Sequence, residues 1–231
     1  MNYSSIKSHA KINLALNVTG KTSGLHQIES IVGFVSLHDV ILIKKIKSKK
    51  HIISFNGKYS KNIYKKNTIS KLLKILEKEK LLTSHRFEIK VKKHIPLKSG
   101  LGGGSMNAAN ILKYLIKKKF INPSKKQLIP ICKSIGSDVA LGLNSTFTVL
   151  KSNNRIKEFK NCKKFYALIV KPGFGCSTKE IYSGVKKFSK PKFSKASKKM
   201  ISFDYLKKLD NSLEAISLSK FPKLKNIKYF L

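Results

Sequence analysis

The chain has 231 residues, which is enough to bury a core without disulfide staples, and its formal net charge is +38, from 49 lysines and arginines against 11 aspartates and glutamates. It contains no run of about 18 apolar residues, which argues against a membrane-spanning helix. The apolar stretch 12–18 is short and is broken by Asn13 and Asn17, so it is not a signal peptide, and we expect a cytoplasmic protein.

The first hundred residues favour strands. Residues 11–18 alternate between polar and apolar side chains, which predicts a half-buried strand with Lys11, Asn13 and Asn17 on its polar face. A turn is expected over 19–24. The further elements expected here are strands over 28–37, 40–46, 52–55 and 87–91, and a helix that opens at Asn67.

The rest of the chain mixes the two element types. The expected helices cover about 105–118, 123–134, 178–188, 204–217 and the last several residues, and the expected strands cover 146–150 and 165–171. Residues 186–199 are rich in lysine and serine and read as an exposed loop. Because no regular β-α-β alternation occurs, the fold class is α+β, and a domain boundary near residue 150 is expected.

The most informative segment holds four glycines in five positions, Gly100 and Gly102–Gly104 with the intervening Leu101, followed by Ser105. Glycines allow backbone amides to approach a ligand closely, and the helix that follows aims its free N–H groups and positive dipole end at the same place. Together these predict a site for the phosphates of a nucleotide. The segment is neither a Walker A loop nor a G-x-G-x-x-G fingerprint. The alternative is a flexible linker, which would rarely separate a regular strand from an amphipathic helix.

The positive charge has two possible origins. Only Arg86 and Arg155 are arginines, whereas lysines are spread along the whole chain. Arginine supplies the bidentate contacts that read nucleic acid, so the composition is typical of drift in an AT-rich genome, and a selected polyanion-binding surface is the alternative. The three cysteines, Cys132, Cys162 and Cys176, are widely spaced and read as reduced thiols.

The segment from Pro96 to Ser105, PLKSGLGGGS, resembles the phosphate loop of the GHMP kinase superfamily, P-x-x-x-G-L-G-[SG]-[SG]-S. Other segments in the same order strengthen the resemblance and extend it over residues 8–214. They are A-K-I-N-L at 10–14, G-L-H at 24–26, G-G-G-S-M-N-A-A at 102–109, G-S-D-V at 136–139, P-G at 172–173 with S-T-K-E-I-Y at 177–182, and N-S-L-E at 211–214.

The resemblance implies a two-domain fold. It places a nucleotide-binding domain like ribosomal protein S5 at 1–150 and a smaller, incomplete α+β substrate-side domain at 151–231. It implies a small-molecule kinase that uses ATP and Mg²⁺. The match is closest to members that phosphorylate the 2-hydroxyl of a cytidine diphosphate-linked methylerythritol in non-mevalonate isoprenoid biosynthesis. Such a protein would be a monomer or homodimer, with no membrane or nucleic-acid partner.

The resemblance also assigns roles to residues. Asp138 would be the catalytic base and Lys11 its partner, although Asp138, at a turn before apolar Val139, also fits a helix N-cap. The residues implied to bind the nucleotide are Asn67, Pro96, Gly100, Leu101, Gly102, Gly103, Gly104, Ser105 and Asn107. The residues implied to bind the substrate are Asn13, His26, Thr178 and Tyr182, the last by stacking on cytosine. No metal-ligand cluster is visible.

Two departures from the family pattern keep other functions open. Leu25 replaces the aromatic residue expected before His26, and the late S-G-[ST]-G-x-x-x-F segment is missing before Leu231. The alternatives are another GHMP kinase, such as a homoserine or mevalonate kinase, and a degenerate or truncated GHMP kinase that binds nucleotide or polyanions without turnover. The G-L-H segment and the triple glycine argue against the first.

Overall fold

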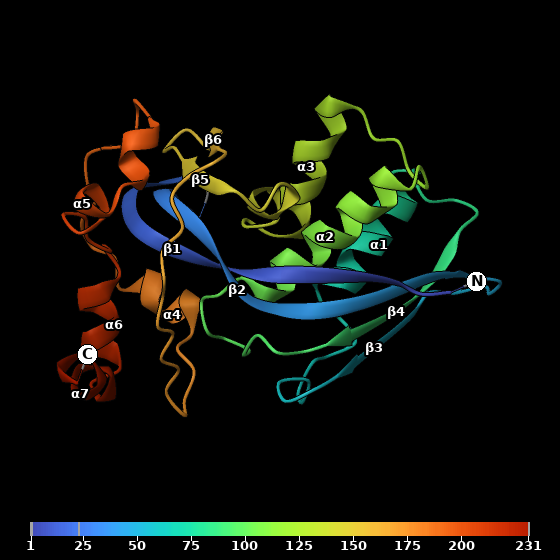
Figure 1. Ribbon diagram of the computed structural model, residues 1–231, viewed down its shortest axis with the longest axis horizontal. Coiled ribbons are helices and arrows are strands. Elements are labelled where there is room, and N and C mark those ends of the chain that lie inside the picture. The colour runs from blue at the N-terminus through green and yellow to red at the C-terminus, as the bar shows by residue number, and fades with distance from the viewer. Residues whose placement is uncertain (1, 23, 231) are drawn as a thin grey trace. The chain divides into compact units, whose positions relative to one another are not determined.

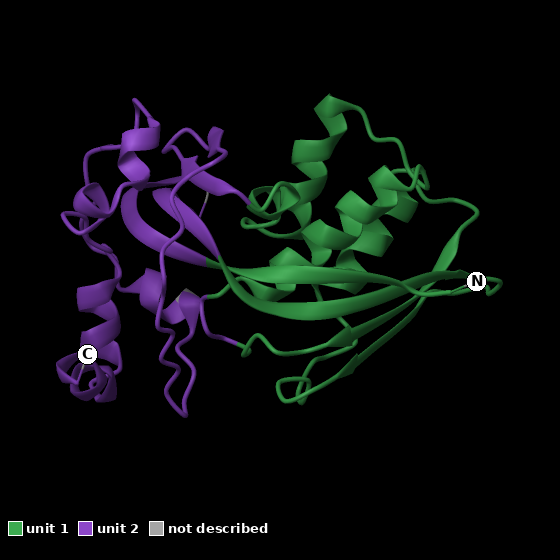
Figure 2. Cartoon of the chain, in the orientation of Figure 1, with its two compact units in different colours: residues 1–11, 35–97, 101–145 green, residues 12–34, 98–100, 146–231 purple. Residues whose placement is uncertain are grey.

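The computed structural model describes residues 2–22 and 24–230 and divides the chain into two compact units (Figure 2). Unit 1 contains residues 1–11, 35–97 and 101–145, and unit 2 contains 12–34, 98–100 and 146–231. The units therefore interleave along the chain instead of following one another, because the first two strands contribute to both. The expected roles of 1–150 and 151–231 stay predictions.

The elements are labelled in Figure 1. The strands are β1 (Ser4–Thr22), β2 (Leu25–Ile46), β3 (Ile52–Asn56), β4 (Arg86–Lys92), β5 (Phe147–Leu150) and β6 (Ile156–Phe159). The α-helices are α1 (Thr68–Lys78), α2 (Gly103–Lys117), α3 (Lys125–Ile135), α4 (Thr178–Ser183), α5 (Phe203–Leu206), α6 (Glu214–Lys220) and α7 (Lys223–Tyr229), and the 3₁₀-helices are η1 (Ala140–Leu143) and η2 (Lys198–Ile201). No helix in the described ranges is both long and apolar enough to cross a membrane.

Unit 1 packs α1, α2 and α3 on one face of a sheet (Figure 1). In that sheet β2 pairs antiparallel with β4, from Val40 opposite Lys92 to Ile46 opposite Arg86, and β3 runs parallel to β4. Alternate residues of β2 and β4 point at the helices, as the two-residue period of a strand requires. The fully buried members of this core include Ile41, Ile43, Phe87, Ile89 and Val91 from the strands and Ile69, Leu72, Leu76, Ile111, Leu112 and Leu115 from the helices.

Unit 2 has a smaller core, in which Ile31 of β2 and Val149 of β5 meet Phe193, Met200 and Ile201. Here β2 pairs antiparallel with β5, and β5 pairs antiparallel with β6. The expectation of an exposed loop over 186–199 is wrong at its centre. Phe193 is fully buried, because its side chain, the largest of the buried ones in this core, packs between the strands and the residues around Met200.

A buried carboxylate also holds that loop. Glu29 of β2 is fully buried and accepts hydrogen bonds from the backbone amides of Lys192 (2.6 Å) and Phe193 (3.0 Å) and from the side-chain amide of Asn17 (2.9 Å). Hydrogen bonds to an ionised acceptor are stronger than neutral ones, so this carboxylate fixes a segment that has no regular structure of its own.

Several expected boundaries are wrong. The expected turn over 19–24 begins too early, because β1 continues to Thr22, and the two strands expected over 28–37 and 40–46 are one strand, β2. The strand expected over 11–18 is covered on both faces from Ala15 to Val18, not half-buried. Residues 165–171 form no strand, and Tyr166 and Leu168 are exposed there. The helix expected over 178–188 ends at Ser183. The helix expected over 204–217 is instead two short helices, α5 and α6.

Acid should weaken unit 1 through Glu88 on β4. The ammonium of Lys44, 2.9 Å from Glu88 Oε2, together with Tyr3 and Lys90, lowers the pKa of this carboxyl from 4.5 to about 2. A depressed carboxyl pKa adds stability that is complete above pH 4.5 and disappears as the pH falls toward 2. We expect wild type to be more stable than Glu88→Gln in urea at pH 7, with a difference that shrinks as the pH is lowered through this window. A difference that is constant with pH would contradict the assignment.

Candidate active site

A lysine and an aspartate that are far apart in the sequence meet in unit 1. Lys11 of β1 is only 5% exposed, and its Nζ lies 3.2 Å from Oδ2 of Asp138. Asp138 follows the end of α3, where Gly136 is the C-cap, and one quarter of its side chain is exposed. The pair therefore holds a carboxylate that solvent or a small ligand can still reach. Such a group can accept a proton from a hydroxyl, while the ammonium stabilises the charge that develops.

The N-cap alternative for Asp138 is not what the structure contains. The 3₁₀-helix η1 begins at Ala140 with Val139 as its N-cap, and no side-chain hydrogen bond caps it within the described chain. The carboxylate of Asp138 instead has the ion pair with Lys11 and a long hydrogen bond of 3.4 Å from the hydroxyl of Ser137.

Lys11 also fixes the glycine loop. Its backbone N–H donates to the carbonyl oxygen of Leu101 (3.1 Å), and its side-chain stem lies against Gly102. Gly102 is the N-cap of α2 and has a φ of 68°, a left-handed conformation that glycine adopts without strain. A Cβ at this position would lie 2.8 Å from Cγ of Lys11, so only glycine fits both the backbone and the space.

The first turn of α2 is built from Gly103, Gly104 and Ser105. No side-chain hydrogen bond caps α2 among the described residues, so its leading N–H groups are available to an anion. The hydroxyl of Thr68 in α1 donates to the carbonyl oxygen of Gly104 (2.7 Å) and holds this turn against the neighbouring helix. The geometry is that of a backbone cradle for phosphate.

Two residues expected near the nucleotide have side chains with structural partners. Asn67 is the N-cap of α1, and its Oδ1 accepts from the backbone N–H groups of Ile69 and Ser70 (3.0 Å each), as the expected helix start requires. Asn107 is 2% exposed, and its Nδ2 donates to Asp39 (2.9 Å). Pro96 and Gly100 lie on the segment between β4 and α2, and Gly100 has a φ of 74° with open space beside it. The nucleotide-binding roles of these residues stay predictions.

The four residues expected to bind substrate belong to unit 2. The rings of His26 and Tyr182 lie together, with centroids 5.1 Å apart and planes at 34°. Asn13 of β1 accepts a hydrogen bond from the hydroxyl of Ser30 (3.2 Å), and Thr178 is the exposed first residue of α4. The structure thus brings the histidine and the tyrosine side by side. Leu25, beside His26, is 77% exposed.

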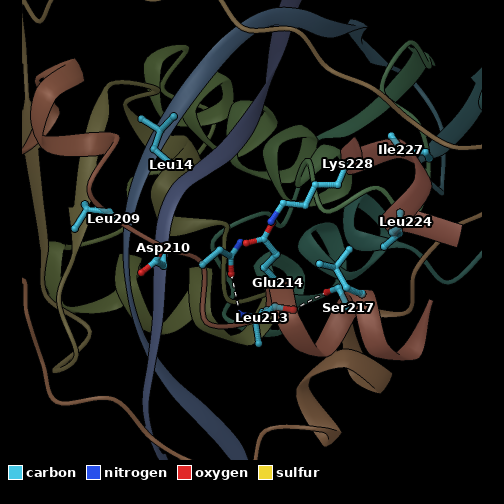
Figure 3. A pocket seen from close by; sticks show the side chains of 11 residues that line it. Leu14, Leu209, Asp210, Leu213, Glu214, Ser217, Leu224, Ile227 and Lys228 are labelled. Atoms are coloured by element: carbon cyan, nitrogen blue, oxygen red, sulfur yellow. Dashed lines mark hydrogen bonds and ion pairs between the residues drawn. The ribbon is translucent and has the colours of Figure 1, made fainter. Parts of the chain in front are cut away.

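A cavity of about 530 Å³ in unit 2 contains none of these residues (Figure 3). Its lining is mostly apolar, and its charged residues are Asp210 and the ion pair of Glu214 with Lys228 (2.8 Å). Leu14 lines it, and Asn13 points to the opposite face of β1 because side chains alternate along a strand. The residues that line the cavity are Leu14, Leu209, Asp210, Asn211, Leu213, Glu214, Ser217, Leu218, Leu224, Ile227 and Lys228.

Sequence reasoning missed Asp39 and Lys93, which form a buried ion pair in unit 1. Asp39 lies between the two strands expected over 28–37 and 40–46, which the structure joins into β2. A charged residue inside an apolar strand is a signal of a buried, bonded group. Within residues 2–22 and 24–230, no three histidine, cysteine or acidic side chains are arranged to hold a metal ion.

Comparison with known proteins agrees with this geometry. Residues 67–150 match the model of the N-terminal domain of GHMP kinases. The chain is 56% identical over 231 residues to the 4-diphosphocytidyl-2-C-methyl-D-erythritol kinase of Pelagibacter ubique. The alignment covers 100% of this chain and 82% of that protein. It is 33% identical to the enzyme of the same name from Clostridium beijerinckii, over 96% of this chain and 81% of that protein.

Solved structures confirm the fold. A crystal structure of 4-(cytidine 5'-diphospho)-2C-methyl-D-erythritol kinase matches 97% of this chain and 81% of its own, with a TM-score of 0.70 and 23% identity. A homoserine kinase from Cytophaga hutchinsonii matches 82% of this chain and 62% of its own, with a TM-score of 0.55 and 18% identity. The α+β class and the GHMP kinase fold expected from the sequence are thereby confirmed.

Replacing Gly102 should cost more stability than replacing Gly100. Both have positive φ, so alanine at either position costs about 1–2 kcal/mol of backbone strain. Only at Gly102 would the added Cβ overlap a neighbour, the stem of Lys11, and overpacking adds about 1–3 kcal/mol. Urea unfolding of Gly102→Ala and Gly100→Ala measures the difference, and equal losses would show that the contact with Lys11 is unimportant.

Proposed function

Because the chain belongs to the family of 4-diphosphocytidyl-2-C-methyl-D-erythritol kinases, we propose that it transfers a phosphoryl group from ATP to the 2-hydroxyl of 4-diphosphocytidyl-2-C-methyl-D-erythritol. The observation that supports this most directly is the Lys11–Asp138 ion pair. Lys11 also contacts Leu101 and Gly102 of the glycine loop, and these four residues all belong to unit 1. A kinase needs both parts: a cradle for phosphates and a base for the alcohol.

In this proposal Asp138 accepts the proton of the attacking hydroxyl. Oδ2 of Asp138 is bonded to Lys11, and the quarter of the side chain that is exposed is where the hydroxyl would approach. The ammonium of Lys11 pairs with the carboxylate and would offset the charge that spreads over the transferred phosphoryl group. The proton passes from the alcohol to Asp138 as the oxygen forms its bond to phosphorus, and ADP leaves.

The backbone of the glycine loop would hold the phosphates of ATP. The N–H groups of the first turn of α2, from Gly103 to Ser105, point outward from the positive end of a 15-residue helix. Mg²⁺ would arrive with ATP and neutralise phosphate charge. Among the described residues, no three histidine, cysteine or acidic side chains form a site for a metal ion.

His26 and Tyr182 would recognise the cytosine of the substrate. The centroids of their rings lie 5.1 Å apart. His26 could therefore hydrogen-bond the edge of the base while Tyr182 stacks on its face. Asn13 and Thr178 complete the proposed substrate contacts. An oligomeric state of monomer or homodimer and a place in the cytoplasm stay predictions.

The purified chain should release ADP from Mg-ATP only when 4-diphosphocytidyl-2-C-methyl-D-erythritol is present. Asp138→Asn should lower kcat by about 10²–10⁴-fold because it removes the base, while ATP binding is retained. The matched control is Asp204→Asn, which changes an exposed aspartate paired with Lys207 and should leave kcat unchanged. ATP binding without any substrate-dependent release by wild type would instead identify a kinase fold that binds nucleotide without turnover.

Adding an aromatic ring beside His26 should tighten substrate binding. Base–aromatic stacking is worth about 1–3 kcal/mol, and Leu25, 77% exposed, supplies no ring. We expect Leu25→Tyr to lower KM for the cytidine substrate by up to about tenfold and Tyr182→Leu to raise it by a similar factor. KM for ATP is the internal control and should not change. If neither variant alters KM for the cytidine substrate, this segment does not contact cytosine.

A further inference from the structure

The carboxylate of Asp39 in β2 is the most completely bonded charged group among the described side chains of unit 1. It is 0% exposed. Its Oδ1 accepts from the backbone amides of His94 (2.8 Å) and Ile95 (2.9 Å), and its Oδ2 accepts from Nζ of Lys93 and from Nδ2 of Asn107 (2.9 Å). A carboxylate has about four acceptor positions, so all of them are occupied.

The four donors come from the two ends of one segment. Lys93, His94 and Ile95 directly precede the loop that begins at Pro96, and Asn107 lies in the second turn of the helix that follows it. One buried side chain from a different strand therefore fixes the points where the glycine loop leaves the sheet and enters α2. Residues 96–102 form no helix or strand, so the anchors at the two ends, together with the contacts of Lys11 at Leu101 and Gly102, position this segment.

The anchor also packs directly against the helix start. A Cβ added at Gly103 would lie 3.0 Å from Cγ2 of Ile95 and 3.2 Å from Nζ of Lys93. The backbone at the start of α2 is thus in close contact with Lys93 and Ile95, both of which are bonded to Asp39. Displacing a catalytic or binding group by about 1 Å can cost about 10²-fold in rate, so small shifts of this support would be felt at the phosphates.

We propose that Asp39 is a positioning residue for ATP, acting through Lys93, the 94–95 amides and Asn107 to set the glycine loop. This inference rests on the proposed function, because it names a further residue on which nucleotide binding depends. It also gives Asn107 a different role from direct contact with the nucleotide: the side chain is an anchor of α2, buried beneath the loop.

Asp39→Asn separates positioning from charge. The substitution keeps the shape but removes one negative charge, which leaves the buried ammonium of Lys93 without its counter-ion. If the network acted on the phosphates only through charge, the extra positive charge would tighten ATP binding. If it acts by positioning, the dissociation constant of ADP, measured by calorimetry on the free chain, should rise by about tenfold. KM for ATP should rise with it, and KM for the cytidine substrate should stay unchanged.

The matched control is Glu29→Gln. Glu29 is likewise 0% exposed and likewise accepts two backbone amides and an asparagine side chain, but it belongs to unit 2 and its three donors are Lys192, Phe193 and Asn17, none of which lies in the glycine loop. It should lower stability without changing ADP binding. A rise in the ADP dissociation constant as large for Glu29→Gln as for Asp39→Asn would overturn the proposal, because any loss of a buried carboxylate would then suffice.

A second variant keeps the test valid if Asp39→Asn fails to fold. Asn107→Ala removes one of the four donors and leaves the ion pair of Asp39 with Lys93 in place. We expect a smaller increase in the ADP dissociation constant, about threefold, and unchanged ADP binding would overturn the proposal. Since ADP binding is measured without the alcohol substrate, a chain that fails to turn over in the kinase assay can still confirm or overturn the role of Asp39.

Discussion

The contact between Gly102 and the stem of Lys11 is the constraint on which the candidate site depends. Gly102 must be left-handed to start α2 where it does, and it must lack a Cβ so that Lys11 can pass. Lys11 then reaches Asp138 with its ammonium while its backbone N–H holds Leu101. The proposed phosphate site and the proposed proton acceptor are therefore both in contact with the same side chain, which distinguishes Lys11 from the many other lysines of the chain.

Two buried carboxylates, one in each unit, have the same structural role. Asp39 in unit 1 and Glu29 in unit 2 each accept two backbone amides from a segment without regular structure. Such a segment has amides that no ladder satisfies, and a buried unsatisfied amide costs free energy. An ionised acceptor compensates several at once. In a chain with only 11 acidic residues, placing two of them in this role shows where the fold needs fixed irregular backbone.

Much of the fold was predictable from local sequence patterns. The helix that opens at Asn67 and the helix over 123–134 were predicted from the sequence, and the structure shows a capping box at Asn67 and another at Ser124. The glycine loop with its helix was predictable because glycine spacing and amphipathic period coincide. Failures occurred where distant partners decide the outcome. The role of Asp39 was not predicted, because its four donors are more than fifty positions away in the sequence. Phe193 was expected in an exposed loop because the segment around it is rich in lysine and serine. The meeting of Lys11 with Asp138 came only from the family resemblance.

The charge of +38 does not by itself explain anion binding at the loop. The two lysines that touch the helix start, Lys11 and Lys93, are both paired with carboxylates, so they add little net charge there. In the proposed function, attraction for phosphate at this point comes from oriented N–H groups and the helix dipole, which act at short range and are less screened by salt than exposed lysines. The remaining lysines raise the general field around the molecule and the encounter rate with anions. Whether that field was selected or drifted, the geometry of the loop decides which anion stays.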